Sequence, residues 1–357
     1  MTLGAETSLA SWRIRLLGSV GNTITTLVLG VILALALIPA LRWAVLDATF
    51  FGTTQADCTG GGACWVFVRE RIGQFVFGFY PEAERWRVAL TFAVFAAAAV
   101  PLLWPSREGS TLARLRQPFM ALLIVGFPVL CWLVIYGALP GLVPIETAKW
   151  GGLMLTLLVS SIGISLALPL GVLLALGRQS ALPVIRVSSV TFIELWRGVP
   201  LITILFMASV MLPLVLPRDV TVDKLVRALV GITLFASAYM AEVVRGGLQM
   251  IPRGQFEAAR AIGLSPWQLQ RLIVLPQALR IAVPGIVNTF IGLVKDTSLI
   301  LIVGMFDLLG MIQSASTHPD WLGSAIEGYV FGGLCFFVIC GAMSHYSRRL
   351  ELKLGSN

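Results

Sequence analysis

The feature that most constrains this chain is a series of apolar runs, each about as long as a membrane-crossing helix. Crossing a bilayer takes roughly 20 apolar residues, and unpaired backbone groups are too costly in lipid for open structures other than helices. The runs lie at 24–45, 88–104, 119–139, 150–176, 187–212, 225–248, 281–302 and 329–346. The sequence therefore predicts an all-α integral membrane protein with about eight transmembrane helices.

Composition and charge agree with a membrane location. Hydrophobic residues make up 57% of the 357 residues and charged residues only 12%, against about 25% charged residues in a typical soluble domain. The net charge of +8 does not indicate nucleic-acid binding, because the basic residues lie in short loops between apolar runs, as in membrane proteins with basic cytoplasmic loops. With only two histidines, no histidine-based metal site is expected.

The distribution of basic residues predicts the orientation. If the N-terminus is cytoplasmic, the C-terminus is cytoplasmic too, and about fifteen basic residues then face inward against about nine outward, as the positive-inside rule requires. The first apolar run continues past Pro39 without a cleavage site of small residues. It is therefore interpreted as a retained span rather than a signal peptide.

The chain divides near residue 140, where residues 139–141 and Pro144 break the apolar pattern. Residues 1–140 are expected to form an N-terminal extension of three spans with a long outer loop, and residues 141–357 a core of five spans. Within the outer loop, apolar residues three and four apart between Trp65 and Phe79 predict an amphipathic helix. This helix would lie either on the outer membrane surface or against another outer loop.

Two cysteines of the outer loop, Cys58 and Cys64, flank a glycine-rich stretch. On the oxidising outer side of the membrane they can form a disulfide, and the intervening glycines relieve the strain of so small a ring. Two free thiols in an exposed loop are the alternative, and both remain open at this point.

The polar segment 252–276 separates the sixth and seventh spans. Apolar residues run through it with helical spacing. Gly263 can adopt the left-handed conformation that ends a helix, and Ser265 followed by Pro266 is typical of a helix start. We therefore expect two helices joined by a sharp turn on the cytoplasmic surface. A short helix with an exposed apolar face suits insertion into a groove on a partner protein.

This segment resembles the EAA signature of ABC importer permeases. The matching residues are Glu257, Ala258, Ala259, Gly263, Ile273, Leu275 and Pro276. Three further stretches resemble the polar amino acid permeases of that family, namely E-L-W-R-G-V-P at 194–200, A-Y-M-A-E-V-V-R-G-G at 238–247 and K-D-T-S-L at 295–299. The extra N-terminal spans and the G-G-A-C-W sequence at 61–65 are similar to the M-type permease of general L-amino acid transporters.

The resemblance implies a fold, a function and a set of partners. The fold would be the five-helix type I importer core with three added helices. The function would be ATP-driven alternating access that carries amino acids, broad-range or polar, across the bacterial inner membrane. A periplasmic binding protein would deliver the cargo, and a second, homologous but non-identical permease would complete the pathway. A cytoplasmic ATPase dimer would dock on Glu257, Ala258, Ala259 and Gly263 and would hold ATP and Mg, so no cofactor is expected on this chain.

The chain itself is not expected to be an enzyme. A phosphate-binding P-loop needs Gly-Lys, and none of the lysines follows glycine: they are Lys149, Lys224, Lys295 and Lys353. No nucleophile–base pair or metal-binding cluster is recognisable. The main alternative is a secondary transporter with Asp296 or Glu194 as a proton site. It would transport without an ATPase, whereas the 252–276 segment favours an ATPase partner.

Charged residues inside apolar runs are candidates for function. Glu194 with Arg197, and Glu242 with Arg245, are spaced i,i+3, so each pair is expected to form an ion pair on its own helix. Both pairs lie near the inner ends of their spans. They are expected to form either a gate or packing network, or a direct contact with cargo.

Lys295 and Asp296 lie past the middle of the seventh span. Adjacent residues on a helix do not face each other, so each side chain needs another partner. A zwitterionic amino acid offers a carboxylate for Lys295 and an ammonium for Asp296, with the hydroxyls of Thr297 and Ser298 nearby. Pairing with other spans for structure alone is the alternative.

Overall fold

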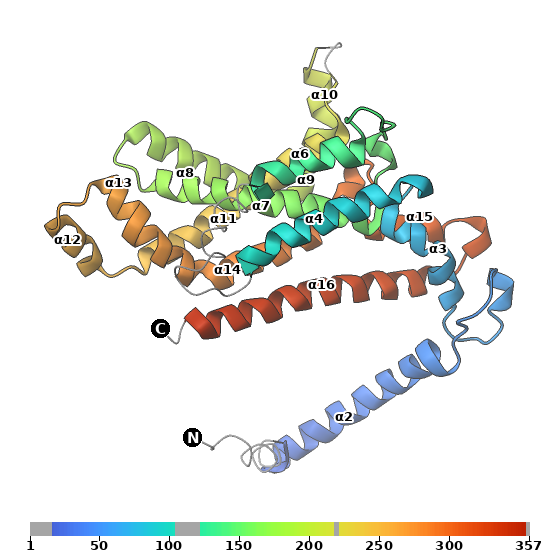
Figure 1. The fold of residues 1–357 in the computed structure, drawn as a ribbon. Coiled ribbons are helices and arrows are strands. Elements are labelled where there is room, and N and C mark those ends of the chain that lie inside the picture. Colours follow the sequence, from blue (N-terminus) through green and yellow to red (C-terminus); the bar gives the residue numbers. More distant parts are fainter. Residues whose placement is uncertain (1–15, 104–121, 218–220, 355–357) are drawn as a thin grey trace. The chain divides into compact units, whose positions relative to one another are not determined.

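The computed structural model describes residues 16–103, 122–217 and 221–354, and these residues are helical almost throughout (Figure 1). Within them, β structure is limited to isolated bridges. The prediction of an all-α chain is therefore confirmed. The described residues form two compact units, one from parts of residues 1–70 and 316–328 and the other from parts of 71–315 and 329–357.

The first unit contains the first predicted span. Helix α2 (Val20–Leu41) begins at Ser19, whose hydroxyl accepts a hydrogen bond from the amide of Asn22 (3.1 Å), and a π-helical turn continues it through Arg42–Leu46. The combined helix of 27 residues is long and apolar enough to cross a membrane. Apolar surface is unfavourable in water, and the length and composition of this helix agree with a membrane location.

The loop after α2 is closed by the disulfide between Cys58 and Cys64, whose Cα atoms lie 5.6 Å apart. The loop is also held to residues 316–328. The amide of Cys64 donates to the carboxylate of Glu327 (2.9 Å), and the side-chain amide of Gln55 donates to the carbonyl of Leu322. Of the two states left open by the sequence, the structure contains the bonded one.

The predicted amphipathic helix is present as α3 (Trp65–Phe77). Its apolar side chains pack against protein, because Phe67 and Phe75 are both fully buried. Phe67 contacts Trp321, with ring centroids 5.5 Å apart, and Phe75 stacks on Phe331 at 5.8 Å. The α3 helix therefore packs against protein, as in the second of the two expected arrangements.

The second unit is built around three long helices, α7 (Gly152–Arg178), α11 (Lys224–Gln249) and α14 (Leu275–Asp296), which pack against one another (Figure 1). Small residues permit close approach of membrane helices, and two glycines mark the closest points. A Cβ atom on Gly171 would lie 2.6 Å from Cβ of Met240, and one on Gly247 would lie 2.3 Å from the carbonyl oxygen of Ala278. The three helices thus depend on glycine at these contacts.

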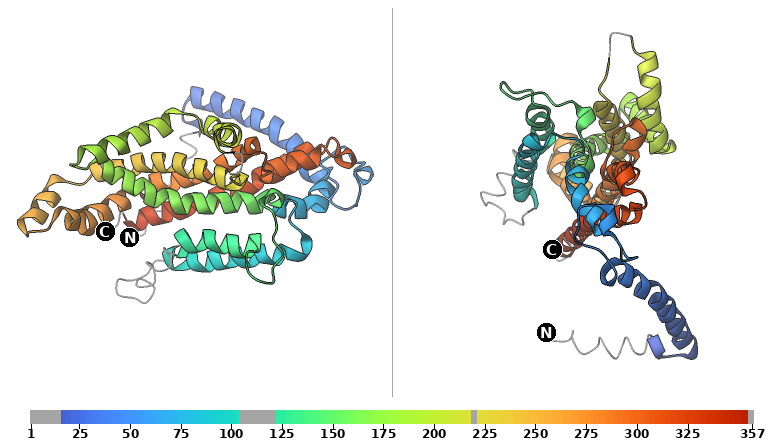
Figure 2. Two further views of the ribbon diagram at one scale, coloured as in Figure 1. Left: turned by 90° about the horizontal axis from the view of Figure 1, so that it is seen from above. Right: turned by 90° about the vertical axis from the view of Figure 1, so that its right-hand side faces the viewer.

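Helix α4 (Arg85–Leu103) lies beside the apolar helix formed by residues 123–136, which includes α6 (Phe127–Leu130) (Figure 1 and Figure 2). Two buried polar side chains hold the surroundings of these helices. The hydroxyl of Tyr80, just before α4, donates to the carbonyl of Ile135 (2.8 Å), and burial raises the pKa of Tyr80 to about 12. Arg87, 1% exposed, donates to the carbonyl of Val143 (2.9 Å) and pairs with Glu84 (2.7 Å).

The fifth predicted span, 187–212, is broken, which corrects the expectation of one continuous helix. Helix α8 (Pro183–Gly198) is followed by α9 (Leu201–Phe206), a π-helical turn (Met207–Met211) and α10 (Leu212–Val215), and the two halves meet at 98°. Val199 is extended (φ −115°, ψ 134°) because it precedes Pro200, and a residue before proline is disfavoured in the α-helical conformation.

The segment 252–276 contains the expected helix, turn and second helix, but the second helix continues into the seventh span, which is a second correction. Helix α12 (Arg253–Ala261) ends at a turn where Gly263 has φ +80°, and Ser265 then forms a capping box with Gln268 at the start of α13 (Pro266–Leu269). From there a π-helical turn leads directly into α14. Pro266–Val303 is therefore one helical span of 38 residues. The predicted boundary at Pro276 lies inside it, in the first turn of α14.

The last elements are α15 (Leu308–Ser316) and α16 (Ala325–Leu354). Among the described residues, five helices are long and apolar enough to cross a membrane, or six if the bent pair is one span. The second and third predicted spans, 88–104 and 119–139, lie partly outside the described residues. The predicted membrane-spanning fold is confirmed, whereas the count of eight is not.

The contact between α11 and α14 yields a test with a neighbouring control. Gly247→Ala should lower the free energy of unfolding by about 1–3 kcal/mol, because the new methyl group would push against backbone rather than a flexible side chain. Gly246→Ala should be neutral or stabilising by up to about 1 kcal/mol, since nothing lies within 4 Å of its Cβ position. Thermal unfolding of the purified protein in detergent measures both, and equal midpoints would contradict the packing argument.

Candidate functional site

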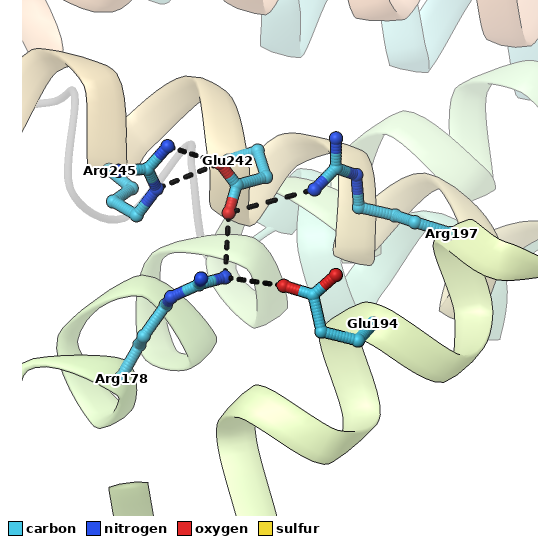
Figure 3. A network of polar contacts seen from close by, with 5 residues as sticks. All are labelled: Arg178, Glu194, Arg197, Glu242 and Arg245. Atoms are coloured by element: carbon cyan, nitrogen blue, oxygen red, sulfur yellow. Dashed lines mark hydrogen bonds and ion pairs between the residues drawn. The ribbon is translucent and has the colours of Figure 1, made fainter.

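Five charged side chains from three helices meet at one end of the second unit (Figure 3). Helix α7 contributes Arg178 at its last residue, α8 contributes Glu194 and Arg197, and α11 contributes Glu242 and Arg245. Basic residues at a helix C-terminus interact favourably with the helix dipole, so Arg178 and Arg197 occupy favourable positions before any ion pair is considered.

Glu242 is the centre of this network. One carboxylate oxygen lies 2.7 Å from Arg178 and 3.7 Å from Arg197, and the other accepts from two nitrogens of Arg245 at 2.7 Å each. Its side chain is 16% exposed, the lowest value in the network. Charge-assisted hydrogen bonds of this length are among the stronger ones in proteins. Glu242 therefore ties the ends of α7, α8 and α11 together.

Only one of the two expected i,i+3 ion pairs is present. Glu242 pairs with Arg245 on its own helix, as expected. Glu194 instead pairs with Arg178 of α7 (3.1 Å), and Arg197 turns toward Glu242, so the expected pair between Glu194 and Arg197 is wrong. Both residues lie on α8, and each side chain finds its partner on another helix: Arg178 of α7 for Glu194, and Glu242 of α11 for Arg197.

Arg178, which bridges both glutamates, is not recognisable as a site residue from the sequence. It closes an apolar run and resembles any basic residue of a loop between spans. Its position in the last turn of a helix was the available signal, but that position does not reveal which carboxylates lie across from it. Three arginines and two glutamates leave the network with a net charge of +1.

Next to the network lies a cavity of about 340 Å³ between α9, α11 and α14. Its polar lining groups are Tyr239, Asn288, Thr289 and Asp296, and its apolar lining includes Leu201 and Phe235. The guanidinium of Arg197 stacks on the ring of Tyr239 (5.5 Å), so the charge network and the cavity share a wall. Asp296 supplies the only carboxylate among the residues that line it.

The other members of the K-D-T-S sequence are placed differently. Lys295 is exposed and does not line the cavity. Thr297 is buried and its hydroxyl donates to the carbonyl of Val294 (2.8 Å), while the hydroxyl of Ser298 donates to the carbonyl of Lys295 (2.9 Å). Both hydroxyls thus bond to their own helix, and of the four residues only Asp296 contributes to the cavity.

The EAA residues of α12 divide between two faces. Ala259 is buried in an apolar cluster that includes residues of α11 and α14, whereas Glu257 and Ala258 are exposed. Gly263 follows with positive φ and nothing within 4 Å of its Cβ position. One face therefore anchors α12 to the bundle, and the other is free to contact another protein.

Comparisons with known proteins agree with this arrangement. Residues 167–352 match the family described as "Binding-protein-dependent transport system inner membrane component". The inner membrane amino-acid ABC transporter permease protein YhdY of Escherichia coli (strain K12) is 50% identical over 318 residues, covering 89% of this chain and 85% of that protein. The glutamate/glutamine/aspartate/asparagine transport system permease protein BztC of Rhodobacter capsulatus is 42% identical, covering 82% of this chain and 79% of that protein.

A solved structure is similar as well. The crystal structure of an amino acid ABC transporter with histidines matches with a TM-score of 0.50 and 26% identity, covering 57% of this chain and 92% of that chain. The chain is thus a membrane permease subunit of the ABC transporter class. It belongs to the family of binding-protein-dependent transport system inner membrane components.

The unequal distances in the charge network can be tested by double-mutant cycles. Glu242→Gln combined with Arg178→Gln should give a coupling energy of about 1 kcal/mol or more, because the pair is close and mostly shielded from water. Glu242→Gln combined with Arg197→Gln should give less than half of that value, since 3.7 Å is too long for a direct hydrogen bond. Unfolding of the four variants of each cycle in detergent provides the measurement. A larger coupling for Arg197 would refute this ranking.

Proposed function

We propose that this chain is the permease of an amino acid importer and that Asp296 contacts the cargo. The single observation that carries the proposal is the 340 Å³ cavity with Asp296 as its only lining carboxylate. Small-molecule sites are typically concave, with volumes of about 300–1,000 Å³ and a few placed polar groups. The names of the two relatives, both amino acid permeases, support the same cargo class.

The cavity suits a zwitterionic amino acid at its ammonium end. A carboxylate is a strong acceptor for an ammonium group, while Asn288, Thr289 and Tyr239 provide further donors and acceptors. We propose that Lys295 binds the cargo carboxylate. It precedes Asp296 in the sequence and is exposed, although it does not line the cavity itself. Thr297 and Ser298 support this region through their backbone hydrogen bonds.

The charge network acts as the gate in this proposal. Glu242 holds α7, α8 and α11 together through three arginines, and Arg197 connects it to the cavity wall at Tyr239. Its side chains remain partly exposed, so the ion pairs can separate without the full penalty of a buried charge. Separation of these helix ends would open the cavity on the side of α12.

The family membership supports a set of partners for this proposal. A periplasmic binding protein delivers amino acid, a second permease, homologous but not identical, completes the pathway, and a cytoplasmic ATPase dimer binds α12. ATP and Mg bind to that dimer, so hydrolysis takes place outside this chain. With α12 cytoplasmic, the N- and C-termini are cytoplasmic and the protein lies in the bacterial inner membrane. A secondary transporter is the rival, and uptake by proteoliposomes that lack the ATPase would favour it.

Removing the cavity charge tests the cargo contact. Asp296→Asn keeps the side-chain shape but loses a charge-assisted hydrogen bond worth about 1.5–3 kcal/mol, so uptake at low cargo concentration should fall about 10–100-fold, mainly through KM. ATP-driven uptake of labelled amino acid is measured in proteoliposomes that contain the complete complex. Asp320→Asn, an exposed carboxylate away from the cavity, is the matched control. Normal uptake by a folded Asp296→Asn complex would refute the contact.

The same uptake assay on Lys295→Met tests the proposed contact with the cargo carboxylate. If Lys295 holds the cargo carboxylate, uptake is lost while the complex still assembles. Loss of assembly, seen by size-exclusion chromatography, would instead assign Lys295 a structural role.

Coupling to the ATPase is tested on α12 and its turn. Glu257→Arg reverses an exposed charge without disturbing the fold, so it should abolish cargo-stimulated ATP hydrolysis together with uptake. Gly263→Ala should weaken coupling through the cost of about 1–2 kcal/mol of a left-handed alanine. Gly254→Ala, in α12 with open space at its Cβ position, should leave coupling intact. Unchanged uptake by the Glu257→Arg complex would mean that α12 is not the docking element.

A further inference from the structure

A second, larger cavity lies between the helix formed by residues 123–136, α7 and α11, with a volume of about 680 Å³. None of its lining residues belongs to the charge network or to the cavity around Asp296. Its walls are almost entirely apolar, with Leu158, Ile162, Leu166 and Leu170 from α7 facing Leu225, Leu229, Val230 and Leu234 from α11. Thr233 adds one hydroxyl to this wall.

Polar and aromatic side chains gather at one end of this cavity. Trp150 lies just before the start of α7, and Asp223 caps the start of α11, so both mark the same end of the bundle. Tyr136 and Trp132 lie on the same lining. Tryptophan and tyrosine are enriched where a membrane protein passes through the headgroup region. This end of the cavity therefore lies at the membrane–water interface, and the apolar walls run from it into the hydrocarbon.

The length of the apolar stretch suits an acyl chain. At a rise of 1.5 Å per residue, the wall extends about 14 Å along α11, from Leu225 to Leu234. Along α7 it extends about 18 Å, from Leu158 to Leu170. The flank of the cavity is open to the outside of the bundle, because Val230 is 51% exposed and Trp132 is 58% exposed.

The charge at the interfacial end points to the headgroup. One carboxylate oxygen of Asp223 accepts from the amide of Leu225 (2.8 Å), and the other accepts from the hydroxyl of Thr147 (2.5 Å). A carboxylate has about four lone-pair sites, so Asp223 retains acceptor capacity, and its side chain is exposed. It can accept from a group that donates hydrogen bonds and carries positive charge.

We propose that this cavity is a phospholipid-binding site, with an acyl chain between α7 and α11 and a primary ammonium of the headgroup on Asp223. The lipid must supply an acyl chain for the apolar walls and a positively charged hydrogen-bond donor for Asp223. Phosphatidylethanolamine supplies both, because its zwitterionic headgroup carries a primary ammonium. Bound there, the lipid fills the groove between the helix of residues 123–136 and the helices α7 and α11. It therefore stabilises the attachment of the 123–136 helix to these two helices.

Native mass spectrometry of the detergent-purified transporter complex tests the headgroup. Phosphatidylethanolamine, phosphatidylglycerol and phosphatidylcholine with identical acyl chains are added separately, and the lipid-bound fraction is measured. Phosphatidylethanolamine should bind most tightly. Asp223→Asn should weaken its binding about tenfold and remove the preference, while the helix cap remains because asparagine caps as well as aspartate. Equal binding of all three lipids to the unmodified complex would overturn the headgroup assignment.

A second pair of variants tests the acyl-chain position. Val230→Trp places a large side chain into the groove from its exposed flank and should abolish lipid retention. Leu173→Trp, at an exposed α7 position outside the lining (64% exposed), should retain the lipid. Retention of the same lipid by a folded Val230→Trp complex would overturn the site. Finding a protein or peptide in the groove in place of lipid would also overturn the site.

Discussion

The rest of the structure depends on the close approach of α7, α11 and α14. At Gly171 and Gly247 the helices are so near that a single methyl group would meet a side chain or backbone of the neighbouring helix. In lipid no hydrophobic force drives helices together, and close packing takes its place. This packing determines which side chains face one another: it brings Glu242 of α11 against Arg178 of α7 and sets the α11 wall of the cavity opposite the α14 wall that carries Asp296.

The break at Val199–Pro200 complements this packing. An unbroken fifth span would carry Arg197 and Leu201 on neighbouring turns of one helix, facing the same environment. The 98° bend separates their surroundings: Arg197 ends α8 and faces the charges on α11, while Leu201 starts α9 and lines the cavity. Because an extended residue before a proline leaves hydrogen-bonding groups without helical partners, such a break is tolerated where protein rather than lipid surrounds it.

Local sequence signals were sufficient for much of the fold and for part of the site. Gly263, Ser265 and Pro266 specify their turn and cap through their own backbone preferences, and the EAA spacing identified α12 and the family. Ion pairs between side chains on different helices could not be predicted from such local signals. The i,i+3 spacing of Glu194 and Arg197 predicts a pair, but partners on α7 and α11 take its place. Arg178 has no sequence neighbour that reveals its two carboxylates. Likewise, the sequence does not distinguish Lys295 from the adjacent Asp296, although only Asp296 lines the cavity.

The continuity of the helix Pro266–Val303 has a mechanical consequence. It begins directly after the turn at Gly263 and carries half of the residues that line the cavity, namely Asn288, Thr289, Gly292, Leu293 and Asp296. Thirty residues of helix span about 45 Å. If the span tilts as one body by about 10° about its start, Asp296 is displaced by roughly 8 Å. No loop intervenes to absorb the motion. If a bound protein displaces α12 and the turn at Gly263, the start of this helix moves with them. The cavity lined by its other half would then change shape directly.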